Sequence, residues 1–344
     1  WVKWVIGEGS RMGFTFALLP TWGDKVRPLA RGAGPVVFNP EKARTFGRDL
    51  AAALRGFPIV WVLGGDRNPV PPDDPPIWSA MAGGIREGAG PDTLMSYHPE
   101  GGQSSASFFH AEPWLSFNML QTGHARKDDP VHEAIRRDLS RHPRKPVIDA
   151  EPCYEAMPVE FWKLTAGRKW TELDPAERTF ARFSAHKGAF GPHDVRKAVY
   201  RALFSGAFGA TYGHNAVWQV HTRDAQPPNI PTTGEWKEAL SAPGARQMGQ
   251  VRQLLEDTGY LEPLDLPVPR LLENKWFVAR SLKTKGTLAY LSDPINGAVL
   301  EHETREVGAN AVMTILLPAD GRQIHQSRLP ARGTLSLPDR KSVV

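Results

Sequence analysis

The sequence has a single cysteine, Cys153, so no disulfide can form within the chain. It has no run of about 18 apolar residues, and we therefore expect no membrane-spanning helix. Its 42 basic and 37 acidic residues are mixed along the chain and give a net charge of +5. The basic residues form no run of the kind that a nucleic-acid surface needs, so nucleic acid is not an expected partner.

Motifs of several common catalytic sites are also absent. Ser104-Ser105 lacks the G-x-S-x-G context, which argues against a serine hydrolase. No G-x-G-x-x-G follows an expected strand at the start of a helix, so a dinucleotide site has no support. The histidines lack a ligand spacing such as H-E-x-x-H and lie on different expected strands. We therefore expect neither a metal site nor another cofactor.

The length of 344 residues fits one domain of about 250 residues and a second of about 80. A hydrophobic content of 41% and a charged content of 23% are typical of a folded, soluble protein. The chain opens at Trp1 in what reads as the middle of a helix, so we expect the N-terminus to be missing. The lack of a signal peptide therefore says nothing about secretion.

An apolar run, a polar loop and a helical pattern alternate along the first three quarters of the chain. The helical patterns cover 1–12, 40–55, 77–88, 130–142, 193–208 and 235–257, and Asn39 is the expected cap of the second. The expected strands begin near positions 14, 58, 94, 117, 146 and 210. Each ends in polar residues, a one-sided placement typical of a (β/α)8 TIM barrel, which builds its active site from the loops after its strands. Six units are visible where eight are needed, so we expect an N-terminally truncated barrel over residues 1–262, with its first two strands missing.

The pattern changes after Glu262. Short apolar-rich segments at 276–282, 286–291, 297–301 and 311–317 are separated by glycine, asparagine, aspartate and proline. They indicate antiparallel strands, and we expect residues 263–344 to form an incomplete β-sandwich accessory domain.

Two acids stand at strand ends in surroundings that favour catalysis. Asp66 follows the buried run 59–63 and two glycines, and Glu151 follows the strand near 146. Their strands are three apart, which places them on opposite sides of a barrel mouth, as strands four and seven. A facing pair of carboxylates suits glycoside cleavage, with one group as acid/base and the other as nucleophile.

Each acid has a simpler interpretation, a buried carboxylate paired with a base, and Arg67 beside Asp66 makes that plausible. Asp149 is the competing acid. Lying two residues before Glu151 on a strand, it is expected to point the same way and to orient a neighbour, with a smaller chance of being the nucleophile itself.

Polar and aromatic residues at the other strand ends supply the donors, acceptors and flat faces that sugars need. The candidates for sugar binding are Trp22, Asp24, Lys25, Arg67, Asn68, His98, Gln103, Gln121, His124, Asp149, Tyr212, His214 and Trp218. Ser104 and His110 lie on the same expected rim. For a single residue such as His110 or Lys25, a structural hydrogen bond is about as plausible as a substrate contact.

Six phrases occur in one order along the chain: LLPTWGDK (18–25), WVLGGDRNP (61–69), SYHPEGGQSS (96–105), FNMLQTGH (117–124), DAEP (149–152) and TYGHNAVWQ (211–219). In this order they resemble the apiosidase-like family of bacterial glycoside hydrolases. The resemblance covers residues 1 to about 260 and implies a (β/α)8 catalytic domain followed by a β-sandwich that carries a collagen-binding label. Family members often have GEP where this chain has Ala150-Glu151-Pro152.

The resemblance implies retaining hydrolysis of plant cell-wall polysaccharide, with release of apiose from complex pectin as the known activity. It implies Asp66 as acid/base, Glu151 as nucleophile, and an extracellular or periplasmic location. Asn68 and Gln121 would then hold sugar hydroxyls, and Arg67 should point away from Asp66, since a tight pair would keep that acid ionised. Two alternatives remain open, the same scaffold acting on another glycoside and a non-catalytic carbohydrate-binding protein.

Overall fold

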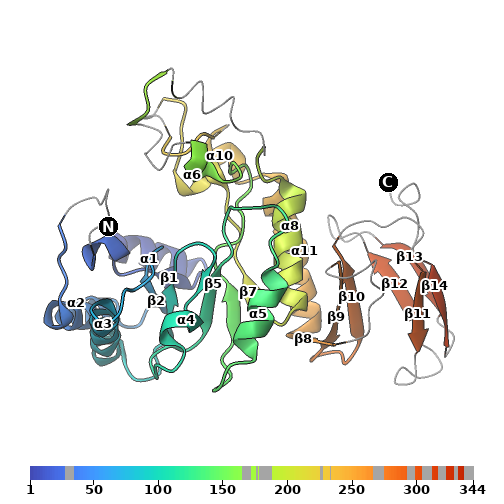
Figure 1. The fold of residues 1–344 in the computed structure, drawn as a ribbon, viewed down its shortest axis with the longest axis horizontal. Coiled ribbons are helices and arrows are strands. Elements are labelled where there is room, and N and C mark those ends of the chain that lie inside the picture. The colour runs from blue at the N-terminus through green and yellow to red at the C-terminus, as the bar shows by residue number, and fades with distance from the viewer. Residues whose placement is uncertain are drawn as a thin grey trace. The chain divides into compact units, whose positions relative to one another are not determined.

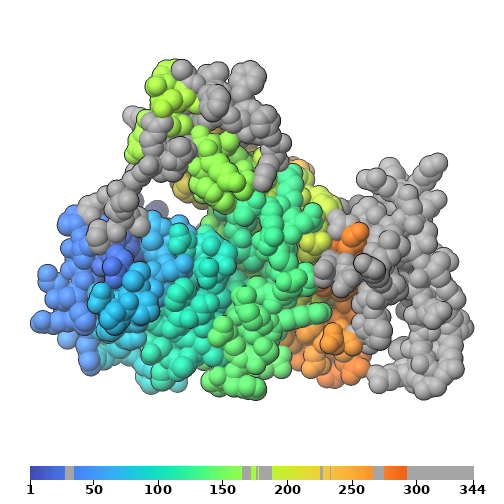
Figure 2. All heavy atoms as spheres, in the orientation of Figure 1, coloured from blue at the N-terminus to red at the C-terminus, as the bar shows by residue number. Residues whose placement is uncertain are grey.

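The computed structural model of the chain describes residues 1–27, 35–164, 172–175, 177, 188–224, 228–232, 234–265 and 275–292, and four later strands by their backbone. Figure 1 draws the elements, and Figure 2 colours the atoms of the described residues up to Ser292. The chain divides into two compact units. Unit 1 comprises Trp1–Cys153 and Gly206–Thr211, and unit 2 comprises Tyr154–Ser205 and Tyr212–Val344.

Among the described residues of unit 1, six strands run parallel to a neighbour, as the sequence predicts (Figure 1). They are β1 (Phe16–Leu18), β2 (Ile59–Gly64), β3 (Met95–His98), β5 (Asn118–Gln121), β6 (Val147–Asp149) and β7 (Gly209–Ala210). Their order follows the sequence, β1-β2-β3 in one sheet and β4-β5-β6-β7 in another, where the short β4 (Gln103–Ser104) runs antiparallel to β5. Ser96 Oγ donates to the Phe117 carbonyl at 2.7 Å and links β3 to the chain entering β5.

Among the described residues of unit 1, four helices lie close to the predicted positions, and a fifth, short one is additional. They are α1 (Val2–Arg11), α2 (Pro40–Ala53), α3 (Asp74–Ala89), α4 (Ala106–Phe109) and α5 (Val131–Leu139), with a 3-10 turn η1 (Gly23–Lys25). The predicted cap of α2 is confirmed, since Asn39 Oδ1 accepts from the Lys42 amide at 2.8 Å. Helices α2 and α3 pack closely at Gly84, where an added Cβ would lie only 2.0 Å from the Arg44 carbonyl.

Aromatic rings fill the core of unit 1 beneath the strand ends. Tyr97 on β3 lies between Trp78 of α3 and Phe109 of α4, with ring centroids 5.5 and 4.8 Å away. All three side chains are buried. Tyr97 Oη nevertheless reaches a partner, the carbonyl of Arg67 at 2.8 Å. The core therefore holds the loop that follows β2 as well as the strands themselves.

Unit 2 contains the helices α6 (Phe161–Leu164), α8 (Pro192–Phe204), α9 (Asn215–Trp218), α10 (Trp236–Ala239) and α11 (Pro243–Thr258). The single helix predicted over 235–257 is broken between α10 and α11. Pro243 occupies the first turn of α11, where its missing N–H costs nothing, and it disfavours helical backbone at the residue before it.

Strands β8 (Leu261–Pro263), β9 (Trp276–Ser281) and β10 (Thr287–Leu291) form an antiparallel sheet in the order β10-β9-β8. Further along, β11 (Val299–Glu303) pairs antiparallel with β14 (Arg332–Ser336), and β12 (Val312–Leu316) pairs with β13 (Gln323–Arg328). The predicted antiparallel strands are thus confirmed, and β13 and β14 are additional to them. The β-sandwich and the domain boundary at residue 262 stay predictions, whereas the α/β class is established.

Candidate active site

The loop after β2 is shaped by two glycines and places Asp66. Gly64 and Gly65 have φ angles of +92° and +90°, and Asp66 itself has a φ of +57°. Aspartate is one of the few non-glycine residues that visit this left-handed region. A Cβ at Gly64 would lie 2.5 Å from the His98 carbonyl, and one at Gly65 would lie 2.9 Å from the Trp22 ring. The loop can therefore lie directly against β3 and Trp22.

Glu151 lies two residues beyond β6 and is held by two histidines. His98 Nε2 is 3.1 Å from its Oε2, and His124 Nε2 is 3.3 Å from its Oε1. The Gly123 amide also donates to the Glu151 carbonyl at 2.9 Å. Burial alone would raise the pKa of this carboxyl, but the bonds and charges of His124 and His98 outweigh burial and lower the pKa to about 2. Glu151 is therefore ionised across the physiological range.

The pKa of Asp66 shifts in the opposite direction, above its ordinary value. Burial raises the pKa of its carboxyl, and the nearby negative charge of Glu151 raises it further. The charge of Arg67, a hydrogen bond from Gln121 and the charge of His98 oppose the rise without cancelling it. The two predicted acids thus lie close enough to interact. The pKa of Asp66 is raised and that of Glu151 is lowered.

Arg67 does not point away from Asp66, contrary to the sequence-based expectation. Its Nη1 donates to the main-chain carbonyl of Asp66 and lies 3.5 Å from Oδ2, the limit of a hydrogen bond. The guanidinium thus bonds mainly the main chain of the loop. Its pairing with the carboxyl is weak enough that the pKa of Asp66 stays raised.

Asp149 and Glu151 contact different partners. Asp149 is the last residue of β6, and the alternation of side chains ends with the strand. The Asp149 side chain has no exposed surface and accepts a 2.8 Å hydrogen bond from Thr122 Oγ1. Burial raises its pKa to about 7. It has no surface in this structure to offer a sugar.

The remaining predicted residues near the β2 loop form small networks. Asn68 exchanges hydrogen bonds with Glu100, accepting from its amide at 3.1 Å and donating to its carboxylate at 3.3 Å. Lys25 pairs with the buried Asp24 at 2.9 Å. Trp22 is half exposed with its ring against Gly65. These residues frame the loop that carries Asp66.

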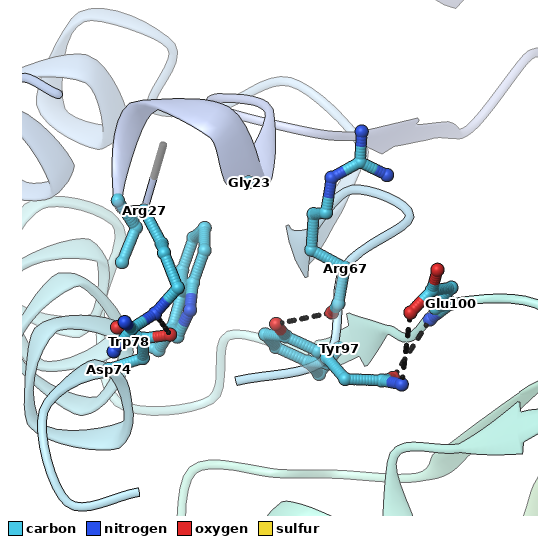
Figure 3. A pocket seen from close by; sticks show the side chains of 9 residues that line it. Gly23, Arg27, Arg67, Asp74, Trp78, Tyr97 and Glu100 are labelled. Atoms are coloured by element: carbon cyan, nitrogen blue, oxygen red, sulfur yellow. Dashed lines mark hydrogen bonds and ion pairs between the residues drawn. The ribbon is translucent and has the colours of Figure 1, made fainter. Parts of the chain in front are cut away.

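A cavity of about 370 Å³ lies beside this loop (Figure 3). Its described walls are Gly23, Val26, Arg27, Arg67, Asn68, Asp74, Trp78, Tyr97 and Glu100. Among these residues, Arg27 bonds Asp74 at 2.8 Å. The acids and bases of the walls balance, and Asp66 and Glu151 are not among the described lining residues, so the cavity neighbours the carboxyl pair rather than containing it.

Four buried polar atoms of predicted site residues have no hydrogen-bond partner among the described residues. They are Asp24 Oδ1, Arg67 Nε, His98 Nδ1 and Gln121 Oε1. Buried polar groups are almost always satisfied in native proteins, so such exceptions are rare. Each of the four atoms is enclosed by its own surroundings and, like Asp149, has no surface in this structure to offer a sugar.

Other predicted residues have structural partners. Gln103 of β4 is exposed and pairs in register with Gln121. Ser104 is buried and bonds Asp138. His110 is buried, with Nε2 2.9 Å from the Pro143 carbonyl and Nδ1 3.3 Å from Asn118, which favours the structural interpretation of this histidine.

Tyr212, His214 and Trp218 belong to unit 2. Tyr212 Oη donates to the buried Glu155 at 2.6 Å, and His214 Nδ1 accepts from the Ala216 amide at 3.1 Å. Trp218 is half exposed and donates to Asn215 at 3.2 Å. Their membership of a common site with Asp66 stays a prediction.

The sequence-based list misses two residues that support the site. Tyr97 fixes the Arg67 carbonyl, and Thr122 bonds Asp149. Tyr97 lies beside His98, and Thr122 lies beside Gln121, both within the quoted motifs. Their position at strand ends is the one sequence feature that points to a place in the site. Their role is to hold other site residues, which sequence spacing does not reveal.

Within the described residues, no three or more histidine, cysteine or acidic side chains are grouped to hold a metal ion. In the same part of the chain, the helices are too short or too polar to cross a bilayer.

Comparison with known proteins gives one family and a set of related folds. A family model described as "Apiosidase-like, catalytic domain" matches residues 1–262. A solved structure named "Glycoside hydrolase" is 23% identical, with a TM-score of 0.76 over 98% of this chain and 72% of its own. A glycoside hydrolase family 5 structure from Bacteroides vulgatus is 24% identical, with a TM-score of 0.79 over 98% of this chain and 69% of its own. No curated protein matches the chain.

Proposed function

Because the chain belongs to the apiosidase-like family of glycosidases, whose catalytic-domain model covers residues 1–262, we propose that Asp66 and Glu151 cleave a glycosidic bond with retention of configuration. Glu151 is the nucleophile and Asp66 the acid/base. The observation that carries this assignment is the opposite shift of the two pKa values within one site. A nucleophile must be ionised and a general acid must hold its proton, so pKa values shifted in opposite directions support these two roles.

In the first step, ionised Glu151 attacks the anomeric carbon while Asp66 gives its proton to the leaving oxygen. The bond to the leaving sugar breaks as the Glu151 ester forms. This ester carries no charge, so one of the causes that raise the pKa of Asp66 disappears. Asp66, now ionised and less basic, takes a proton from water as the water attacks the ester, and the second step returns both groups to their starting state.

His98 and His124 support the nucleophile. Their bonds to Glu151 stabilise its carboxylate and fix both oxygens, so that attack needs little reorganisation. Asp24, Arg67 and Gln121 are candidates for binding sugar hydroxyls, and Trp22, whose side chain is half exposed, would supply an apolar wall. Asn68, Lys25, His98, His124 and Gln103 stay candidates for further contacts, as do Tyr212, His214 and Trp218 of unit 2.

The substrate we propose is a plant cell-wall polysaccharide, with apiose in pectin as the released sugar. The family assignment supports this choice. For the architecture we propose a (β/α)8 barrel, supported by six parallel strands in sequential order and by the fold shared with solved glycoside hydrolases. Residues 263–344 would form an accessory β-sandwich, supported by their antiparallel strand pairs.

Three measurements test the assignment. Asp66→Ala and Glu151→Ala should each lower apiose release from pectic oligosaccharides by orders of magnitude with binding largely kept. NMR of the first product should show the anomer of the substrate. With 4-nitrophenyl apioside, azide should rescue Asp66→Ala to a glycosyl azide of retained configuration and Glu151→Ala to one of inverted configuration. Unchanged turnover in both variants contradicts the site.

The second candidate is the same chemistry on another glycoside, because a fold and its acids do not set the sugar. The balanced charges of the cavity beside Asp66 favour a neutral sugar there. Release assays on hemicellulosic and pectic oligosaccharides in parallel distinguish the two. Hydrolysis of a hemicellulosic glycoside with no apiose release would keep the mechanism and replace the substrate.

A further inference from the structure

Asp149 is a buried carboxyl for which the proposed mechanism has no chemical use. It has no exposed surface, so it reaches neither substrate nor water. A carboxyl in such a place is costly unless its oxygens are bonded. Oδ2 accepts from Thr122 Oγ1 at 2.8 Å, and Oδ1 lies 3.5 Å from the Thr122 amide. The main-chain amide of Glu151 is also a donor to Asp149.

These bonds join the two segments that make the nucleophile site. Thr122 begins the segment that leaves β5, and His124, two residues later, bonds Glu151 Oε1 at 3.3 Å. Between them, the Gly123 amide donates to the Glu151 carbonyl at 2.9 Å. The contacts therefore form a closed ring. Asp149 bonds Thr122, the chain leads from Thr122 to His124, His124 bonds Glu151, and the chain leads back from Glu151 to Asp149.

We propose that Asp149 is a positioning residue, which fixes segment 122–124 so that His124 stays bonded to Glu151. This role rests on the proposed function of Glu151 as nucleophile. A small displacement of a group that orients a reacting atom can cost about 100-fold in rate, so the ring has a catalytic consequence even though Asp149 never touches substrate.

The charged groups around Glu151 make its pKa a measure of the positioning role of Asp149. Glu151 faces His98 from β3, His124 from the segment after β5 and Asp66 from the loop after β2. Asp149 faces Asp129, which precedes α5, and the amide of Glu151. Loosening segment 122–124 removes only the His124 contribution, so the pKa of Glu151 should rise while His98 continues to hold it below the ordinary value.

Thr122→Val tests the ring with the least disturbance, because valine keeps the shape of threonine and removes the hydroxyl that bonds Asp149. Thr122→Ser keeps the hydroxyl and is the matched control. We expect Thr122→Val to lower kcat by about 10- to 100-fold with KM nearly unchanged, and Thr122→Ser to stay near wild type. Asp149→Ala should resemble Thr122→Val, because it removes the acceptor oxygens to which Thr122 and the Glu151 amide donate.

A double-mutant cycle shows whether Thr122 acts through His124. If it does, Thr122→Val combined with His124→Gln loses no more activity than His124→Gln alone. Losses that multiply overturn the proposal. So does a Thr122→Val variant with a lower Tm but unchanged kcat, since that result describes a merely structural bond.

A second readout needs no substrate. In protein carrying 13C-labelled glutamate carboxyls, with the Glu151 signal assigned from Glu151→Gln, the pKa of about 2 should rise in Thr122→Val and not in Thr122→Ser. An unchanged pKa contradicts the inference. If Glu151→Ala retains turnover, the proposed function fails; if Glu151→Ala is inactive while Thr122→Val and Asp149→Ala are both fully active, only the positioning role fails.

Discussion

The guanidinium of Arg67 lies 3.5 Å from the carboxyl of Asp66, and the pKa of Asp66 is raised nevertheless. Burial and the charge of Glu151 together outweigh the arginine, whose Nη1 bonds the main chain of the same loop. Arg67 therefore moderates the proton affinity of Asp66 and does not abolish its use as an acid. This balance can be changed from either side, and the two directions give separate predictions.

Removing the positive charge should make Asp66 a weaker acid. In Arg67→Gln the pKa of Asp66 rises further, so the basic limb of the pH profile of kcat/KM moves to higher pH. The profile is measured on pectic oligosaccharides, and Arg86→Gln, whose arginine bonds the Pro113 carbonyl, is the control that should leave the limb in place. A limb that moves to lower pH in Arg67→Gln contradicts the assignment of Asp66 as the acid.

Removing the negative charge should have the opposite effect. In Glu151→Gln the carboxyl of Asp66 loses a neighbour that raises its pKa, so the pKa falls. Because this variant is inactive in the proposed mechanism, the measurement is NMR of 13C-labelled aspartate carboxyls across pH. The variant mimics the uncharged ester of Glu151, and the fall reports how far Asp66 changes from acid to base between the two steps. An Asp66 pKa that stays the same would show that the two carboxyls are not coupled.

Periodicity and strand-end chemistry predicted much of the fold and of the site. The parallel strands, the Asn39 cap and the joint position of Asp66 and Glu151 follow from the period of the apolar runs and from what stands at their ends. These features depend on local sequence and on the geometry that all parallel sheets share. They require no knowledge of individual side-chain rotamers.

The features that were not predicted depend on rotamers and on where a strand stops. The choice of Arg67 between carboxyl and main chain is a choice of rotamer, and Gly23 leaves room for the observed one, since a Cβ there would lie 2.4 Å from the arginine side chain. β6 ends at Asp149, so the alternation of side chains along a strand does not fix which partners Asp149 and Glu151 contact. The break before α11 comes from Pro243. The helical pattern on both sides of this proline favours one continuous helix, which is why the break was not predicted.

Glu151 should give the protein a measurable dependence of stability on pH. Its folded-state pKa of about 2 lies below the ordinary 4.5, so its contribution is present above pH 4.5 and is lost as pH falls through the folded value. The shift corresponds to roughly 3 kcal/mol at neutral pH. We expect the free energy of unfolding of wild type, minus that of Glu151→Gln, to rise between pH 2 and pH 5. Urea titrations at each pH measure it, and a difference independent of pH would refute the low pKa.

Gly64 should be the least replaceable residue of the Asp66 loop. Its φ of +92° is unfavourable for any residue with a Cβ, and that atom would also lie 2.5 Å from the His98 carbonyl, which belongs to the strand that presents His98 to Glu151. Gly64→Ala must therefore either strain the loop or push it off β3, and we expect a loss of about 1–3 kcal/mol in stability together with a large fall in kcat. Gly83→Ala is the matched control, because Gly83 lies inside α3 and, apart from the backbone of its own helix, its added Cβ would meet no described atom within 4 Å. That control should be stabilised by about 0.4–1 kcal/mol with kcat unchanged. If both variants show the same Tm and the same turnover, the tight contact between the β2 loop and β3 has no part in placing Asp66.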